Sequence, residues 1–268
     1  MTKTNIVTIL FLGDVFGEPG RRGLQEILPK LKENYQPDAV FVNCENSANG
    51  RGISHRLVKE VLDAGVDFMT SGNHIYQVKD IYNYLDDPQG KIIRPYNFPR
   101  NSPGRGLDVF TTDSGVRIGL INLMGNLFMQ APVDSPFTTI DQALLELQSE
   151  ADIIIVDFHA EATSEKRALA WQLDGRAQLL VGTHTHVMTA DEEIFPDGMA
   201  FITDLGMCGP FDSVIGMDKN IVLKKFRTLI PNRFDVAKDD IRVNGIVCEI
   251  DVQARKAVSI NRIQEKVL

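Results

Sequence analysis

Short apolar runs alternate with amphipathic segments along the first two thirds of the chain. Residues 6–12 form a nearly continuous apolar run, which is typical of a strand buried on both faces. Leu24, Ile27, Leu28 and Leu31 then recur at helical spacing. Further buried strands are expected at residues 39–42, 66–70, 152–156 and 178–181. Strands and helices in alternation predict parallel βαβ units and therefore an α/β fold.

A hairpin and a group of short strands are expected in the rest of the chain. Residues 107–112 and 116–123 predict the hairpin, with Asp113-Ser114-Gly115 at its turn. After His186 the pattern indicates strands at 193–194, 199–202, 241–252 and 257–263. The Gly-rich residues 205–216 are expected to be a loop. Since no repeat or Ser/Pro linker is present, residues 1–268 are expected to form one α/β domain with a two-layer sheet core.

Five of the apolar runs end in residue types that bind divalent metals through oxygen or nitrogen. The five motifs are Gly13-Asp14, Asn43-Cys44-Glu45-Asn46, Gly72-Asn73-His74, Asp157-Phe158-His159 and Thr183-His184-Thr185-His186. Ligands bind beyond the carboxyl ends of strands in open α/β sheets, so residues far apart in sequence are expected to converge there. The sequence therefore predicts a metal-dependent enzyme.

Each motif taken alone has a structural explanation. Asp14 after a glycine is typical of a turn, Asn73 of a loop cap, and His159 of a hydrogen-bonded core histidine. The joint pattern favours function, because polar side chains at five strand ends are costly to bury without a metal or substrate. Two ions need a shared oxygen ligand, and the two oxygens of Glu45 make it the natural bridge. The residues that can supply the terminal positions are Asp14, Asn46, Asn73, His159, His184 and His186.

Composition narrows the class of partner. The 28 Lys and Arg residues against 36 Asp and Glu give a net charge of −8, which disfavours long nucleic acid as a partner. A metal pocket can still attract a small phosphate ester. The three cysteines are widely spaced and indicate free thiols, and no apolar run approaches membrane length. A cytoplasmic protein that binds no membrane is therefore expected.

The residues of these motifs resemble the motifs of one known family. Phe11-Leu12-Gly13-Asp14-Val15-Phe16-Gly17, the four motifs that follow it and Met207-Cys208-Gly209 together resemble the YmdB family of calcineurin-like metallophosphoesterases. The resemblance runs over essentially the whole chain. It implies an α/β/β/α fold, in which helices flank a sandwich of two sheets.

The resemblance also implies a bacterial phosphodiesterase that acts on 2′,3′-cyclic nucleotides and releases 3′-nucleotides. Hydroxide between two metal ions would attack phosphorus, and His74 would be the general acid. One ion would be held by Asp14, Glu45, Asn46 and His186. The other would be held by Glu45, Asn73, His159 and His184. Iron or manganese is favoured, with zinc as an alternative, and a homodimer or homotetramer is expected from the resemblance.

Other interpretations stay open at this point. The broader superfamily has Asp-x-His as its first motif, whereas Phe16 stands at the third position here. A catalytically weak nucleotide sensor is therefore one alternative, and a phosphomonoesterase or another phosphodiesterase is a second. Arg51 is a candidate phosphate contact, and Phe128 with Met129 could stack a base or simply pack. Glu161 follows His159 as in zinc deaminases, but the chain lacks the required Cys-x-x-Cys.

Overall fold

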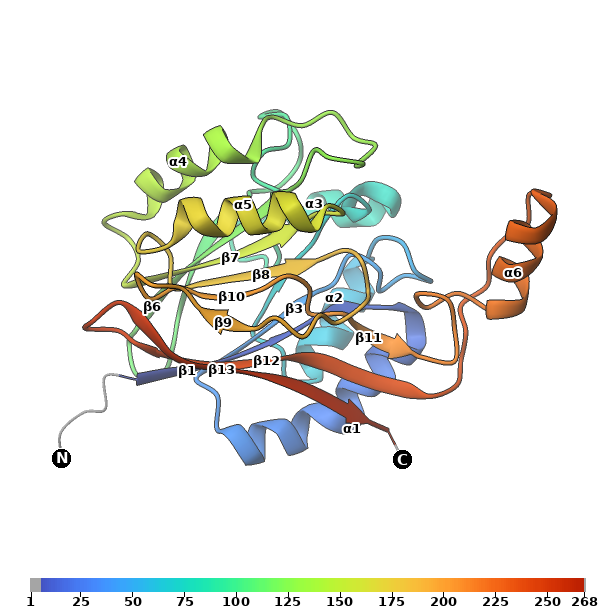
Figure 1. The fold of residues 1–268 in the computed structure, drawn as a ribbon, viewed down its shortest axis with the longest axis horizontal. Coiled ribbons are helices and arrows are strands. Elements are labelled where there is room, and N and C mark those ends of the chain that lie inside the picture. Colours follow the sequence, from blue (N-terminus) through green and yellow to red (C-terminus); the bar gives the residue numbers. More distant parts are fainter. Residues whose placement is uncertain (1–5, 268) are drawn as a thin grey trace.

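The computed structural model describes residues 6–267 and shows two β-sheets packed face to face, with helices on both outer faces (Figure 1). This confirms the expected α/β/β/α architecture. Strands in such a sandwich are covered on both sides, which explains why so many of them read as continuous apolar runs rather than as alternating patterns.

The first sheet contains seven strands. Its order is β2 (Asp14–Val15), β11 (Met207–Pro210), β12 (Ile241–Asp251), β1 (Ile6–Leu12), β3 (Ala39–Asn43) and β4 (Phe68–Thr70), with β13 (Lys256–Lys266) also paired to β12. The β1, β3 and β4 strands are parallel, whereas β12 runs antiparallel to β1. The carboxyl ends of β1, β3 and β4 therefore lie along one edge of the sheet.

The second sheet contains six strands. Its order is β5 (Leu107–Thr111), β6 (Arg117–Met124), β7 (Ile153–His159), β8 (Leu179–Thr183), β10 (Ala200–Ile202) and β9 (Glu193–Ile194). The expected hairpin is confirmed as the antiparallel pair of β5 and β6. Since β6, β7 and β8 are parallel, the carboxyl ends of β7 and β8 are neighbours.

Helices cover the outer faces of the sandwich. α1 (Gly17–Tyr35) and α2 (His55–Asp63) pack on the first sheet, while α4 (Pro136–Leu147) and α5 (Thr163–Leu173) pack on the second. Between β4 and β5 lie the short helices η1 (Ile75–Gln77), η2 (Lys79–Ile81) and α3 (Tyr82–Leu85). A separate apolar core between the sheets joins side chains such as Phe11 and Phe41 of the first sheet to Ile155 of the second.

Two expectations for the last third of the chain are wrong. The Gly-rich residues 205–216 are not all loop, because β11 pairs with β2 and β12. In addition, α6 (Lys219–Thr228) stands where only strands and loops were expected, and it projects away from the layers (Figure 1). Val222 is the one buried residue of this helix, so the sequence lacks the wide apolar stripe by which helices are recognised.

Within residues 6–267, no helix combines the length and the apolar character needed to cross a lipid bilayer.

Candidate metal centre

The candidate ligands lie at or just beyond the carboxyl ends of β1, β3, β4, β7 and β8. They are Asp14, Glu45, Asn46, Asn73, His159, His184 and His186, and all are buried or half-buried. The two sheets thus present their ligand-bearing edges to each other. The expected convergence of residues distant in sequence is present in the structure.

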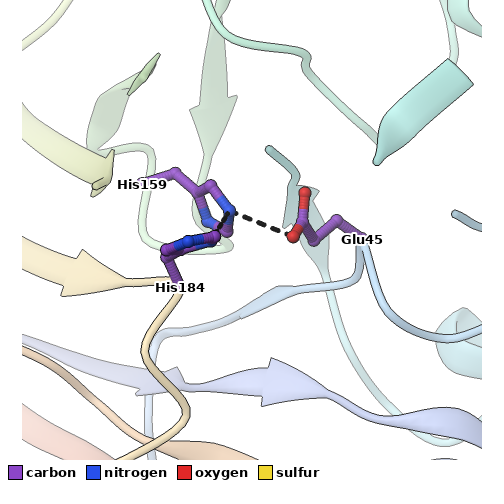
Figure 2. A group of neighbouring side chains, drawn as sticks. All are labelled: Glu45, His159 and His184. Atoms are coloured by element: carbon purple, nitrogen blue, oxygen red, sulfur yellow. Dashed lines mark hydrogen bonds and ion pairs between the residues drawn. The ribbon is translucent and has the colours of Figure 1, made fainter. Parts of the chain in front are cut away.

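Four of these residues form what we call the Glu45 cluster. Glu45, His159 and His184 place one ligand atom each within 4.8 Å of one another (Figure 2). His159 Nε2 lies 3.0 Å from Glu45 Oε1 and 3.0 Å from His184 Nδ1. Asn73 Oδ1 is also 3.0 Å from His159 Nε2. Gly72 permits this approach, since a Cβ there would lie 2.3 Å from the His159 ring.

The hydrogen bonds of the two histidines show where their protons lie. Thr183 Oγ1 donates to Asp157 Oδ1, at 2.7 Å, and therefore accepts from His159 Nδ1, at 2.9 Å. His184 Nε2 lies 3.3 Å from the Glu161 carboxylate, an ion-pair distance, so a proton on Nε2 would face an acceptor. The two nitrogens that face each other, His159 Nε2 and His184 Nδ1, then carry lone pairs rather than protons. When Glu45 is ionised, the Glu45 cluster thus brings together four acceptor atoms with no proton between them, and such a donor set fits a divalent cation.

A second group, the Asp14 cluster, shows the same signature. His186 Nδ1 donates to the Ile215 carbonyl at 3.0 Å, which leaves Nε2 as a lone pair. That atom faces Asn46 Oδ1 at 3.3 Å and Asp14 Oδ1 at 3.9 Å. Asp14 Oδ1 is buried and has no hydrogen-bond partner among the described residues. Three acceptors again converge, and an unpaired buried carboxylate oxygen is costly unless a cation compensates it.

The pKa shifts agree with this interpretation. Burial lowers the pKa of His159 well below its usual range and raises the pKa of Glu45. Their 3.0 Å contact has the length of an ion pair, but both shifts oppose charge, so we regard it as two ligand atoms brought together. Burial, together with Asp204 and Glu45, also raises the pKa of Asp14. A bound cation would favour the ionised carboxylates and the unprotonated imidazoles.

His74 lies beside two candidate ligands, Glu45 and Asn73. Its backbone N–H donates to Glu45 Oε2 at 2.9 Å, and its Nε2 lies 3.3 Å from the Asn73 amide nitrogen. If that amide donates, the His74 proton sits on Nδ1, which has no partner in residues 6–267. Burial lowers the pKa of His74, while Glu45 opposes the shift.

A buried polar layer beneath the ligands could not be found from the sequence. Asp157 accepts hydrogen bonds from Thr70, Thr183 and Asn43, and burial raises its pKa to about 6. Asn43 and Asp157 lie inside the polar motifs, but neither was recognised there as a supporting residue. Both are fully buried, and both hydrogen-bond to Thr183, which in turn orients the candidate ligand His159.

A buried ion pair holds the His-x-His segment. Lys166 Nζ lies 2.7 Å from Asp204 Oδ2 and donates to the Thr183 carbonyl at 2.8 Å. Asp204 Oδ2 accepts from the Thr185 N–H at 3.1 Å. His184 and His186 have φ values of 99° and 65°, a left-handed conformation that costs free energy for any residue with a Cβ. Lys166 carries no sequence signal, because it looks like any helical lysine.

A cleft of about 650 Å³ opens over these residues. Some of its lining residues are polar and form what we call the ligand wall, namely Glu45, Asn46, His184 and His186. Others are apolar and form what we call the apolar wall, namely Val214, Ile215, Met217, Phe226 and Phe234. No pattern in the sequence predicted the apolar wall.

The remaining residues singled out in the sequence differ in where the structure places them. Arg51 lines the cleft, as expected for a phosphate contact. Phe128 is 84% exposed and is not among the lining residues, whereas Met129 packs against a helix-covered core. Phe16 is buried, and its ring lies edge-on to His186 with 5.3 Å between the ring centroids. Its side chain therefore packs beside a candidate ligand but offers no ligand atom.

Comparison with known proteins identifies the family of this chain. The family described as YmdB-like protein matches residues 10–263. The chain belongs to the YmdB-like family. The resemblance inferred from the motifs is thereby confirmed, and the YmdB-like match includes every candidate ligand.

Individual relatives support the same assignment. The chain is 45% identical to the 2′,3′-cyclic-nucleotide 2′-phosphodiesterase of Bacillus subtilis (strain 168), over 95% of this chain and 96% of the relative. A crystal structure of a novel phosphatase from Mycoplasma pneumoniae matches with a TM-score of 0.90 and 36% identity, over 98% and 94% of the two chains. A hypothetical protein from Thermus thermophilus matches with a TM-score of 0.90 and 37% identity, over 97% and 99%. This chain and the two solved structures therefore share one fold over nearly their whole length.

Proposed function

We propose that this protein is a metal-dependent phosphodiesterase that hydrolyses 2′,3′-cyclic nucleotides to 3′-nucleotides. The observation that carries the proposal is the Glu45 cluster, in which four acceptor atoms converge without a proton between them. The substrate class is supported by the name of the Bacillus subtilis relative, which is 45% identical over 95% of this chain.

The ligand assignment is part of the proposal. Asp14, Glu45, Asn46 and His186 would hold one ion, and Glu45, Asn73, His159 and His184 the other. Nitrogen and hard oxygen donors suit iron or manganese, with zinc as the alternative. Bound divalent cations would supply a water-derived nucleophile at neutral pH and would offset charge on the phosphoryl oxygens.

The chain's own residues complete the chemistry. His74 lines the cleft, and the Asn73 side chain contacts its Nε2 at 3.3 Å. An imidazole in this place can donate a proton to the departing ribose oxygen. Arg51 lines the same cleft and would attract the phosphate anion. His74 is therefore the proposed general acid, and Arg51 a proposed substrate contact.

Turnover and metal content measured together test this proposal. Protein loaded with iron or manganese should convert 2′,3′-cyclic AMP to 3′-AMP. His74→Ala should lower kcat by about 10²- to 10⁴-fold while the metal content stays the same. His55→Ala is the matched control, since His55 stacks on Tyr84 at 4.9 Å between ring centroids and does not line the cleft. Fully loaded protein that hydrolyses no cyclic nucleotide would refute the proposal.

A phosphomonoesterase is the second candidate function. It is favoured by one finding, the description of the Mycoplasma pneumoniae structure as a phosphatase. A panel that compares 2′,3′-cyclic AMP with 3′-AMP and p-nitrophenyl phosphate separates the two activities. Preference for the monoesters would establish the second candidate. Tight nucleotide binding without turnover would instead favour a sensor, as Phe16 at the superfamily's histidine position first indicated.

A further inference from the structure

The apolar wall has no role in the chemistry described so far. It comes from the segment after β11, from α6 and from Phe234, all of which lie outside the strand ends that supply the ligands. Phosphodiester hydrolysis needs cations, donors and water, and none of these groups is an apolar side chain. The presence of this wall in the same cleft as the ligand wall therefore needs a separate explanation.

The wall leaves large apolar side chains open to solvent. Phe226 is 70% exposed and Ile215 is 51% exposed, and both line the cleft. Val187, 59% exposed, lies at the rim beside the His-x-His segment. Scattered apolar residues on a surface are ordinary, but a concentration of them at a polar site indicates a ligand with an apolar part.

Positive charge is placed at the same wall. Lys225 Nζ lies 4.7 Å from the centroid of the Phe234 ring, and both residues line the cleft. Arg51 lines the cleft as well. The wall thus offers aromatic faces with cations beside them, a combination that accepts a planar ring attached to an anionic sugar phosphate.

We propose that the apolar wall is a nucleobase subsite, in which Phe226 and Ile215 contact the face of the base while the cyclic phosphate lies at the ligand wall. This inference rests on the proposed phosphodiesterase function and adds the part of the substrate that the enzyme recognises. A 2′,3′-cyclic nucleotide has this division, because its phosphodiester is on one side of the ribose and its base projects from C1′. Stacking on an aromatic ring tolerates every base, so the subsite selects nucleotides over abasic cyclic phosphates.

The subsite and the candidate metal centre are physically connected. The Ile215 carbonyl accepts the Nδ1 proton of His186 at 3.0 Å, while the Ile215 side chain lines the cleft. Ile215 itself has a φ of 47°, so its backbone is held in the left-handed region. One residue therefore orients a candidate ligand with its backbone and contacts the base with its side chain.

Paired substrates test this inference. The kinetics of 2′,3′-cyclic AMP are compared with those of methyl ribofuranoside 2′,3′-cyclic phosphate, which keeps the reactive ring but lacks a base. Phe226→Ala should raise KM for the nucleotide about tenfold, with kcat unchanged, and should leave both constants for the abasic substrate unchanged. Phe226→Trp should restore the nucleotide KM. Leu223→Ala, also on α6 but outside the cleft, is the matched control.

Binding of the product gives a readout without turnover. Calorimetry should show a roughly tenfold weaker Kd of Phe226→Ala for 3′-AMP and an unchanged Kd for ribose 3-phosphate. Since Phe226 is mostly exposed, its truncation should not disturb folding. Equal effects on both members of a pair, or a wild-type enzyme that does not discriminate between them, would overturn the subsite and leave the phosphodiesterase intact. Hydrolysis of neither substrate would instead overturn the proposed function.

Discussion

The ligand wall and the apolar wall line one cleft but are built differently. The ligand wall stands on the ends of central strands, and its residues are oriented by buried partners such as Thr183 and the Lys166–Asp204 ion pair. The apolar wall stands on α6 and the segments that flank it, and Val222 is the one residue that α6 buries.

This difference follows from the different requirements of holding a metal ion and of stacking a planar ring. Ligand atoms must be held within about 0.5 Å of a productive geometry, which needs buried and fully hydrogen-bonded neighbours. A surface that stacks a flat ring tolerates small movements, so a helix with little packing is sufficient. We therefore expect changes behind the ligand wall to lower stability and metal affinity, and changes in the apolar wall to act locally.

The largest effect is expected from Lys166→Met. This change leaves the Asp204 carboxylate buried without its cation, and it also removes the donor to the Thr183 carbonyl. The free energy of unfolding should fall by about 3–5 kcal/mol, as measured by urea denaturation. Lys224→Met on the exposed side of α6 is the control and should change it by less than about 0.5 kcal/mol. Similar losses for both variants would remove the contrast between the walls.

Thr183→Val should act on metal affinity. The hydroxyl of Thr183 links His159 Nδ1 to Asp157, and valine has the same shape but neither donates nor accepts. Metal titration should show an affinity about 10- to 100-fold lower, because the ligand histidine loses the partner that orients it. Thr185→Val, whose hydroxyl contacts the Val187 backbone, should bind metal as the wild type does. An unchanged affinity for Thr183→Val would show that this support is dispensable.

Asp218→Ala tests the apolar wall. The Asp218 side chain caps α6 by accepting the backbone N–H groups of Asn220 and Ile221, at 2.9 and 3.0 Å. Loss of the cap should destabilise α6 by about 1 kcal/mol and speed amide hydrogen exchange there. The urea midpoint of the whole protein should not move, since the helix buries so little. A lower midpoint would mean that α6 unfolds together with the sheets.

The smallest effect is expected from Asp240→Asn, directly before β12. Hydrogen bonds from Arg242 and Lys266 lower the pKa of Asp240 from 3.8 to about 2. A lowered folded-state pKa contributes stability above the ordinary value, and this contribution is lost as the pH falls from about 4 to 2. Both ion pairs of Asp240 are partly exposed to solvent, so the difference between wild type and variant should be below about 1 kcal/mol at pH 6 and should be largely lost by pH 2. A difference that persists at pH 2 would exclude this ion pair as its source.

The sequence predicted most of the strands but not their order in the sheets, and it placed metal-binding residue types at the strand ends. Each strand that ends in a metal-binding residue type is present, because buried parallel strands leave an unmistakable apolar run. The helix at 219–228 was missed for the opposite reason, since it buries one residue and shows no apolar stripe. β11 was missed because four residues with a central glycine do not display a period.

The order of residues along the chain establishes which side-chain types stand at the strand ends, and hence that metal-dependent chemistry was to be expected. Which of these side chains come into contact depends on the folded structure. Asn46 and His186 are 140 residues apart, and the supporting pair Asn43 and Asp157 are 114 apart. Periodicity describes how a segment faces the core, but contacts between distant segments depend on how two sheets and their loops pack. The apolar wall and the proposed base subsite emerged only when the chain was folded, because their residues come from a helix and loops that no local pattern brings together.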